Sequence, residues 1–589
     1  DLIVIAEGKT GNVAVGDAGG YIGSGKAVTV ENSNISNVKQ VSGAYHAGGY
    51  IGLMKSGTVA EAGDETGALL NSVLGAVLNV QQLAGVLQMA SSQIINSKVS
   101  GIETGMTVKA ECRSDNSKAN SSAMAGGFVG EMQSGIINNE VNKTGEQKGT
   151  AVENLLRVEG LRYAGGFGGL VKSGSVAEIG ENTAILNGIV LNDLISLINS
   201  FVPVIQNASV RSVANGFSVH VTGIDTEDDT KDSNAGSAGG FIGYGSGVQI
   251  SYSDVDKLCN TTVKEPSDLQ STDGTSYFGN ESDYSVKGYR NAGGYFGKVN
   301  AGSTAAIGGV NIFKKLINLG SLVSALNVTI STIEHSDVYG AVGGFNVIAN
   351  NSSGNVGKAG GFAGNALGSS IQNCNVDNFA HIIGRESAGG YAGTIEPSSA
   401  ADLLGDVKVL SGLISADNLV GVLRTFVPII KNSETTSVPC GGVVRADAES
   451  SDAIKRGLAG GYVGYNLGGQ IKGNDGEDST IAKECAVIRI RSVYGTEYAG
   501  GYTGLMESAN VADTGSISLL YDLIKLDNPL TAVQAIYATE ENTAVYGPLT
   551  YVDVNDWNGW VTYVGSKGPY ADEFAGKTPS AEEKNLFET

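Results

Sequence analysis

A six-residue phrase, Ala-Gly-Gly-Tyr/Phe-x-Gly, occurs ten times and constrains the fold of this chain more than any other feature. Self-similarity over most of a chain indicates a stacked repeat array, in which each repeat packs against its neighbours. A residue that recurs in ten copies is therefore interpreted first as structural. The copies begin at Ala18, Ala47, Ala125, Ala164, Ala238, Ala292, Ala359, Ala388, Ala459 and Ala499.

The intervals between successive copies alternate between short and long. The shortest interval, 29 residues, occurs twice, from Ala18 to Ala47 and from Ala359 to Ala388, and we interpret it as one bare coil. The four long intervals exceed it by 78 − 29 = 49, 74 − 29 = 45, 67 − 29 = 38 and 71 − 29 = 42 residues. A segment of nearly constant size is therefore inserted after every second copy.

The inserted segments have helical periodicity. In the first of them, apolar residues recur at helical spacing from Leu70 to Leu78. Gly, Asn or Asp interrupts each segment midway, which favours two short helices in a hairpin over one long helix. The five predicted hairpins lie within Ala68–Asn79, Ile185–Phe201, Ile312–Leu326, Leu403–Val427 and Ile517–Ala535.

Between the inserted segments the chain has the pattern of short strands. Apolar residues, then Asn at a corner, then Val recur, as in Ser370–Val376 and Ile205–Val210. We therefore predict a mainly β fold over residues 1–542: a single elongated β-solenoid (β-helix) of about ten rungs. Five α-helical hairpins are inserted at one corner, every second rung.

The fourth position of the phrase is always aromatic, whereas the fifth varies. Stacked coils place equivalent positions above one another, about 4.8 Å apart. The sequence thus predicts a structural aromatic ladder that fills an internal slot; an exposed ladder that stacks against sugar rings is the alternative. Its members are Tyr21, Tyr50, Phe128, Phe167, Phe241, Tyr295, Phe362, Tyr391, Tyr462 and Tyr502.

Composition excludes several other classes. With 86 Gly but only 9 Pro, the chain is not collagen-like, and with 41% hydrophobic residues it is not disordered. A net charge of −22 disfavours nucleic acid and anionic membranes as partners. No apolar stretch approaches the ~18 residues of a membrane span. The start at Asp1, without an apolar leader, suggests a mature or excised piece.

No motif predicts an enzyme or a cofactor. Residues 20–26 nearly form a P-loop, but Ala27 stands where the metal-binding Ser or Thr should be. Five widely spaced Cys and four His show no metal-site spacing, and the Cys are interpreted as buried or incidental thiols. Two acidic loops, Asp225–Asp232 and Asn474–Asp478, could hold Ca²⁺, although solvated loops are the simpler interpretation.

Residues 543–589 leave the repeat and contain both tryptophans, Trp557 and Trp560. We predict an aromatic-rich C-terminal cap or the start of a following module, and a ligand site around the two Trp is an alternative.

The stretch Ala359-Gly-Gly-Phe-Ala-Gly-Asn-Ala-Leu-Gly-Ser-Ser-Ile-Gln-Asn-Cys-Asn-Val376 resembles the GLUG-type repeat, a glycine-rich β-solenoid motif of large bacterial (Gram-positive-type) surface proteins and adhesins. Variants of it recur over roughly residues 10–510. The resemblance implies an extracellular, cell-surface or secreted stalk or adhesive region, and it carries over no catalytic residues. The regular helical hairpins depart from the simple family pattern.

The leading functional hypothesis is a non-enzymatic structural or adhesive protein, serving as a rigid stalk or filament segment of a bacterial cell surface. Its expected partners are other copies of itself, in a fibre, or a ligand on a host or bacterial surface. A carbohydrate-binding or carbohydrate-active β-solenoid is the alternative, and solvent-facing carboxylates clustered on one face would favour that enzyme.

Overall fold

The computed structural model describes residues 1–6, 9–10, 13–14, 16–56, 91–111, 123–139, 149–174, 201–214, 216–222, 234–258, 285–302, 327–341, 343–350, 356–398, 427–439, 441–448, 456–474, 484–509, 537–547, 550–551 and 560–562.

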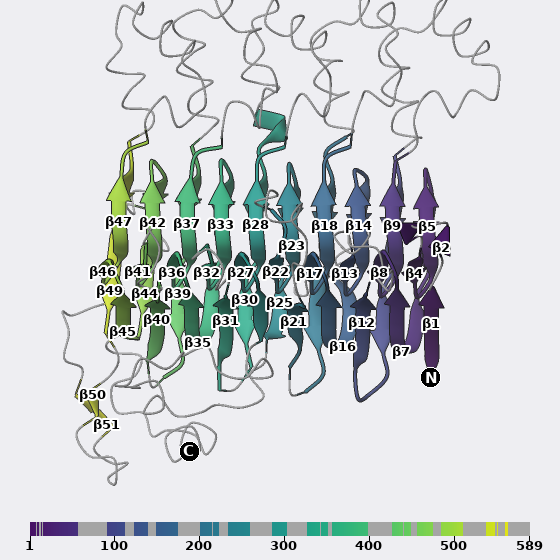
Figure 1. Ribbon diagram of the computed structural model, residues 1–589, viewed down its shortest axis with the longest axis horizontal. Coiled ribbons are helices and arrows are strands. Elements are labelled where there is room, and N and C mark those ends of the chain that lie inside the picture. The colour runs from purple at the N-terminus through teal and green to yellow at the C-terminus, as the bar shows by residue number, and fades with distance from the viewer. Residues whose placement is uncertain are drawn as a thin grey trace, which may run out of the picture.

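The described chain is mainly β and runs in successive coils that stack parallel to one axis (Figure 1). Every coil contributes one strand to each of three ten-stranded parallel sheets. Sheet 1 contains β4 (Asp17–Gly19), β8 (His46–Gly48), β13 (Met124–Gly126), β17 (Tyr163–Gly165), β22 (Ser237–Gly239), β27 (Asn291–Gly293), β32 (Lys358–Gly360), β36 (Ser387–Gly389), β41 (Leu458–Gly460) and β46 (Tyr498–Gly500).

Sheets 2 and 3 follow sheet 1 along each coil. Sheet 2 contains β5 (Ile22–Lys26), β9 (Ile51–Lys55), β14 (Val129–Gln133), β18 (Gly168–Lys172), β23 (Ile242–Ser246), β28 (Phe296–Asn300), β33 (Ala363–Leu367), β37 (Ala392–Glu396), β42 (Val463–Leu467) and β47 (Thr503–Glu507). Sheet 3 contains β6 (Thr29–Glu31), β10 (Gln93–Ile95), β15 (Ile136–Asn138), β19 (Val204–Gln206), β24 (Gln249–Ser251), β29 (Thr332–Glu334), β34 (Ser370–Gln372), β38 (Ile429–Lys431), β43 (Gln470–Lys472) and β48 (Thr539–Glu541).

Sheet 4 closes each coil and is less regular. A coil gives it either one long strand or two short ones, and a long strand such as β16 pairs with both short strands of a neighbouring coil. Because of these double pairings, the strands of sheet 4 form closed loops of hydrogen-bonded neighbours and have no single linear order. The strands are β1 (Leu2–Ala6), β7 (Ile35–Gly43), β11 (Val99–Gly101), β12 (Met106–Ala110), β16 (Thr150–Gly160), β20 (Ser209–Ser212), β21 (Ser218–Val221), β25 (Val255–Leu258), β26 (Val286–Gly288), β30 (Val338–Gly340), β31 (Phe345–Ala349), β35 (Val376–Gly384), β39 (Thr435–Ser437), β40 (Gly442–Ala446), β44 (Cys485–Ile488), β45 (Ile490–Gly495) and β49 (Thr543–Tyr546).

The ten phrases stack in register. The alanine that opens each phrase pairs with the alanine of the next across all nine strand pairings of sheet 1. The prediction that the phrases superimpose in one column is therefore confirmed. The parallel architecture is consistent with a β-solenoid.

Glycine is required in the phrase because the backbones approach so closely. A Cβ built on Gly360 would lie 2.0 Å from the carbonyl oxygen of Ala363, where the chain turns from sheet 1 to sheet 2. A Cβ on Gly361 would lie 2.0 Å from the carbonyl oxygen of Gly390 in the next coil. Neither position can hold a larger residue without a backbone shift.

The aromatic residues of the phrase form one continuous column. Successive ring centroids lie 4.7–5.2 Å apart and their planes deviate by at most 20°. The eight rings from Tyr50 to Tyr462 are fully buried. The internal slot does not extend to the ends: Tyr21 is 47% exposed and Tyr502 is half-buried, because Tyr21 begins the column and Tyr502 ends it.

The tyrosine hydroxyls of the aromatic column donate hydrogen bonds to backbone carbonyls at the corner of the coil that follows sheet 3. The hydroxyl of Tyr295 donates to the carbonyl of Ser253 at 2.6 Å, and that of Tyr391 donates to the carbonyl of Cys374 at 2.9 Å. Without an acceptor a buried hydroxyl is costly, so these bonds allow Tyr as well as Phe to occupy the column.

At the corner that follows sheet 3, one residue of most coils adopts the left-handed backbone conformation (positive φ). The central position of the sheet 3 strands is a buried isoleucine in eight successive coils, from Ile94 to Ile471. Two residues later the backbone has positive φ at Asn96, Asn373 and other asparagines. Asn tolerates this conformation better than other non-glycine residues, so the predicted Asn corner is confirmed.

All five predicted insertions leave the same corner. Each begins after a sheet 2 strand (β9, β18, β28, β37 or β47) and ends before the next sheet 3 strand, which places one insertion in every second coil. Apart from their last residues Phe201 and Val427 in two copies, the predicted helical hairpins lie outside the described residues. The described part contains no helical hairpin, and its one helical segment is residues 327–329.

The boundary predicted at residue 542 stays a prediction, but parallel pairing continues past it. Strand β49 pairs with β44, so the regular stack extends to Tyr546. Beyond it, the described residues form the antiparallel pair β50 (Thr550–Tyr551) and β51 (Trp560–Thr562), whereas Trp557 lies outside the described part. The pair β2 (Lys9–Thr10) and β3 (Val13–Ala14), also antiparallel, lies near the N-terminus.

Candidate functional site: a buried charged chain across four coils

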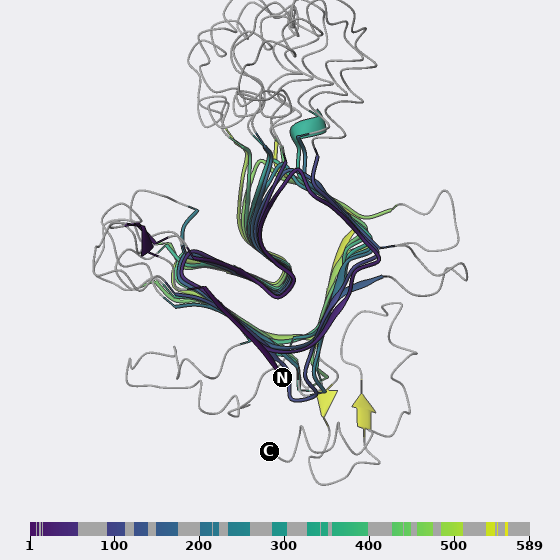
Figure 2. The same cartoon turned by 90° about the vertical axis from the view of Figure 1, so that its right-hand side faces the viewer.

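Sheets 1 and 2 meet at a sharp inward bend of every coil (Figure 2). Three columns of side chains contact one another along this bend: the residue before each phrase, and the residues six and eight positions after the phrase alanine. In the first four coils these columns contain two ionisable residues that are almost completely buried, His46 and Glu131, together with the partly exposed Asp17 and Lys172.

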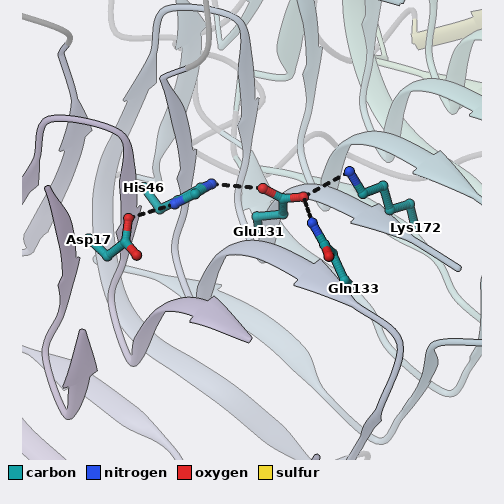
Figure 3. A network of polar contacts seen from close by, with 5 residues as sticks. All are labelled: Asp17, His46, Glu131, Gln133 and Lys172. Atoms are coloured by element: carbon teal, nitrogen blue, oxygen red, sulfur yellow. Dashed lines mark hydrogen bonds and ion pairs between the residues drawn. The ribbon is translucent and has the colours of Figure 1, made fainter. Parts of the chain in front are cut away.

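A chain of polar contacts runs through five of these residues, here called the charged chain: Asp17, His46, Glu131, Gln133 and Lys172 (Figure 3). The His46 imidazole donates from Nδ1 to Asp17 Oδ1 and from Nε2 to Glu131 Oε2, both at 2.7 Å. The other oxygen of Glu131, Oε1, accepts from Gln133 Nε2 at 2.6 Å and from Lys172 Nζ at 3.0 Å. The residues come from β4, β8, β14 and β18, so the chain links four successive coils.

The ionisation states follow from these contacts. Burial opposes a charge on His46, but hydrogen bonds to Asp17 and Glu131 more than offset it and raise the pKa of His46 above its ordinary 6.5. Burial likewise opposes ionisation of Glu131, yet the His46 hydrogen bond and the Lys172 charge hold the pKa of that carboxyl well below its usual range. The chain is therefore an alternation of negative and positive groups near neutral pH.

This geometry suits cohesion better than catalysis. Both imidazole nitrogens of His46 donate hydrogen bonds, so neither offers a lone pair for general-base chemistry. The side chains of His46 and Glu131 are only 3% and 5% exposed, which keeps a substrate from reaching them. Buried charges that are paired and fully hydrogen-bonded are tolerated, whereas removing one partner is strongly destabilising.

A second charged cluster occupies the same columns further along the stack. Lys358 Nζ lies 3.1 Å from Glu396 Oε1 and 3.7 Å from Glu386 Oε1, and Asn365 donates to Glu396 at 2.9 Å. Burial alone would raise the pKa of Glu396, but the Lys358 charge lowers it below its ordinary value. In the third to fifth coils, apolar residues of the same columns, Met124, Tyr163, Leu170 and Tyr244, pack together. Between the two clusters the position before the phrase is polar again, and Asn291 donates to Ser237 at 3.0 Å.

The aromatic residues and the histidines noted in the sequence lie in different parts of the structure. The aromatic column lies in the core and not in the charged chain. Of the other histidines, His220 lies 3.4 Å from an Arg157 nitrogen, and His335 stacks on Tyr252 with ring centroids 5.0 Å apart. His381 is partly buried beside Asn346, and desolvation together with the Arg491 charge lowers the pKa of His381 to about 4.

Several other sequence predictions fall wholly or partly outside the described residues. The acidic loop Asp225–Asp232 and all of Asn474–Asp478 except Asn474 belong to this group, so the Ca²⁺ prediction stays a prediction. Cys374 and Cys485 are buried thiols that form no disulfide bond with another described cysteine, as expected for structural thiols, and the other three cysteines are not in the described part.

The charged chain was not predicted from the sequence, although part of its signal is present there. Asp17 and His46 both stand immediately before a phrase alanine and are one 29-residue coil apart. Aligning the phrases places them in neighbouring coils at the same position, where opposite charges attract. Glu131 could not be found in this way, because its contact with His46 depends on how sheet 2 folds back on sheet 1.

In comparisons with known proteins, no family model, no curated protein and no solved structure matches the chain. In the described ranges, no cluster of three or more His, Cys, Asp or Glu is arranged to hold a metal ion. Nor does that part of the chain contain a helix with the length and apolar character that a membrane span requires.

The charged chain predicts a pH dependence of stability. Since the folded-state pKa of His46 is raised, its contribution is present below about pH 6.5 and is lost as the pH rises through the folded value. The Glu131 contribution has the opposite sign: it is present above about pH 4.5 and is lost as the pH falls. Stability of the first four coils should therefore decline as the pH rises above about 6.5 in the parent protein, and His46→Gln should flatten that decline.

Amide hydrogen exchange of β4, β8 and β14, corrected for the intrinsic pH effect, measures this directly. His335→Gln is the matched control, because His335 is exposed and lies in a different coil. The interpretation fails if His46→Gln retains the parental pH dependence in these strands.

Proposed function

We propose that this chain is a non-enzymatic, extracellular structural or adhesive segment of a bacterial cell surface, part of a rigid stalk or filament. The observation that carries the proposal is the use of its buried ionisable groups. These groups form hydrogen bonds and ion pairs between neighbouring coils, and the ten phrases stack without a break in register. A stack of ten coils at about 4.8 Å per coil is about 48 Å long.

The five insertions fit this role as lateral elements. They leave one corner in every second coil, about 10 Å apart along the axis if coils are about 4.8 Å apart. Helices pack at 8–10 Å, so helical hairpins at this spacing would cover one face of the stalk and contact one another. The hairpins are part of the proposal.

Protease shaving of intact cells of the source organism tests the location. Peptides of this chain should appear in the supernatant of trypsin-treated intact cells, at a yield close to that from lysed cells. An abundant cytoplasmic enzyme serves as the lysis control. Release of the peptides only after lysis would contradict the proposal.

A second candidate function, carbohydrate binding, is favoured by one specific feature. At the corner where Asn occurs in other coils, two successive coils carry Tyr252 and His335, with φ of 52° and 50°. This left-handed conformation costs most residues roughly 1–2 kcal/mol, and such strain often marks functional positions. The two rings are exposed and parallel, and Tyr339, also exposed, donates to Asp337 beside them. Aromatic faces flanked by carboxylates suit the apolar faces and hydroxyl groups of neutral sugars.

The variant Tyr252→Asn tests this candidate cleanly. It installs the residue found at the other corners, so thermal stability should be unchanged or slightly higher. Binding to any glycan identified on an array of neutral oligosaccharides should weaken roughly two- to tenfold, the usual contribution of one ring contact. Absence of glycan binding by the parent protein, or unchanged binding by the variant, would eliminate carbohydrate recognition at this corner.

A further inference from the structure

In the second charged cluster, a lysine amine and a side-chain carboxamide converge on one carboxylate oxygen. Glu396 Oε1 lies 3.1 Å from Lys358 Nζ and accepts a hydrogen bond from Asn365 Nδ2 at 2.9 Å. An amine is a nucleophile once it is neutral, a carboxamide carbon can accept it, and a carboxylate can carry protons between the two. The cluster therefore holds the three groups that the exchange of one amide for another requires.

The backbone places Lys358 and Asn365 opposite each other across the inward bend. The strand pairings put Lys358 beside Ser387 and Asn365 beside Thr394 in the next coil. There the hydroxyl oxygens of Ser387 and Thr394 lie 2.7 Å apart, so two short side chains are enough to span the bend. The much longer lysine side chain can therefore reach Cγ of Asn365.

The carboxamide of Asn365 is buried and only partly hydrogen-bonded. The residue is 3% exposed, and within the described part of the chain its Oδ1 has no hydrogen-bond partner. A buried acceptor without a partner is uncommon and costs free energy, so this carboxamide is held in an unfavourable state. The same burial keeps water from competing with the lysine amine for the carboxamide carbon.

We propose that Lys358 and Asn365 become joined by an intramolecular isopeptide bond, which the folded protein forms without another enzyme and with Glu396 as the proton carrier. The two residues lie on either side of the glycine turn between β32 and β33. The bond would therefore fasten the inward bend covalently. This inference goes beyond the proposed function and does not depend on where the protein is located.

The reaction balances with the groups that are present. Lys358 first passes a proton to Glu396, and the lone pair of Nζ then forms a bond to Asn365 Cγ. Glu396 donates its proton to Nδ2, the Cγ–Nδ2 bond breaks, and Glu396 takes a second proton from Nζ. The departing ammonia accepts that proton. The net change converts a lysine ammonium and a carboxamide into a secondary amide and one ammonium ion, and Glu396 is again a carboxylate.

The charges of the resting cluster make this reaction slow. Burial opposes both charges, but the Glu386 and Glu396 charges raise the pKa of Lys358, and the Lys358 charge lowers the pKa of Glu396. A neutral amine therefore arises only in the minor form in which the proton has moved to Glu396, and the bond forms well after folding. Because this transfer leaves the charge of the pair unchanged, the rate should be independent of pH around neutrality.

Intact-mass spectrometry of the purified full chain, followed during incubation, tests the proposal. The mass of the parent protein should fall by one ammonia molecule and then stay constant. Chymotrypsin cleaves after large aromatic residues, and Phe362 lies between the two joined residues. The digest of the incubated protein should therefore contain the peptides on either side of Phe362 still joined through Lys358 and Asn365.

Two variants separate the chemistry from the packing. Lys358→Arg keeps the positive charge but lacks the primary amine, so it should lose no ammonia. Glu396→Gln keeps the shape of the side chain but cannot carry a proton, and should slow the loss of ammonia by on the order of 10²–10⁴-fold. Circular dichroism checks that both variants are folded.

The charged chain supplies a matched control. Lys172 and Gln133 share Glu131 Oε1 in the same way, but the Lys172 side chain is 40% exposed, and water solvates its amine. This trio should not react, so Lys172→Arg should lose one ammonia molecule at the parental rate.

A parent mass that stays at the value of the sequence would overturn the proposal. So would a loss of ammonia that maps to other residues, or one that Lys358→Arg shows as fast as the parent. None of these outcomes bears on the surface location, which protease shaving decides separately.

Discussion

The close approach of neighbouring backbones at the glycine phrase is the constraint on which the rest of this structure depends. The second phrase glycine leaves no room for a Cβ, because the carbonyl oxygen of the next coil lies about where that atom would be, 2.0 Å away at Gly361. This contact recurs from coil to coil and fixes the position of the residue that follows it. The backbone contact therefore sets the distance between successive aromatic rings, whose centroids lie 4.7–5.2 Å apart, a favourable stacking distance.

The inward bend created by the phrase explains where the buried charges lie. Sheet 2 folds back on sheet 1 directly after the two glycines, and side chains from both sheets are enclosed between them. In the first coils the enclosed residues are Asp17, His46, Glu131 and Lys172, whose charges alternate along the stack. In the third and fourth coils, Met124 and Tyr163 fill the position before the phrase with apolar surface. One backbone geometry thus accepts either kind of filling, provided that each buried charge has its partner.

The period of the phrase was enough to predict the parallel stack, the aromatic column and the corner from which the insertions leave, because these features repeat with the backbone. The Asn corner was predictable for a similar reason: Asn is among the few residues that adopt positive φ at low cost. The charged chain was not predicted, since the contact between His46 and Glu131 spans 85 residues and two sheets. Tyr252 and His335 were missed because they replace Asn in only two coils. The exposure of Tyr21 depends on its place at the end of the column, which the phrase does not encode.

The most direct test of this account compares the same substitution at two copies of the phrase. Gly361→Ala would place a Cβ against the carbonyl of Gly390, whereas Gly501→Ala, in the last coil, would meet only a Val545 methyl at 3.8 Å. Overpacking of a rigid contact costs about 1–3 kcal/mol or more, so Gly361→Ala should lower the thermal unfolding midpoint and increase hydrogen exchange in β32 and β36. Gly501→Ala should behave like the parent protein. Equal effects of the two substitutions would contradict the claim that backbone contact between coils holds the stack together.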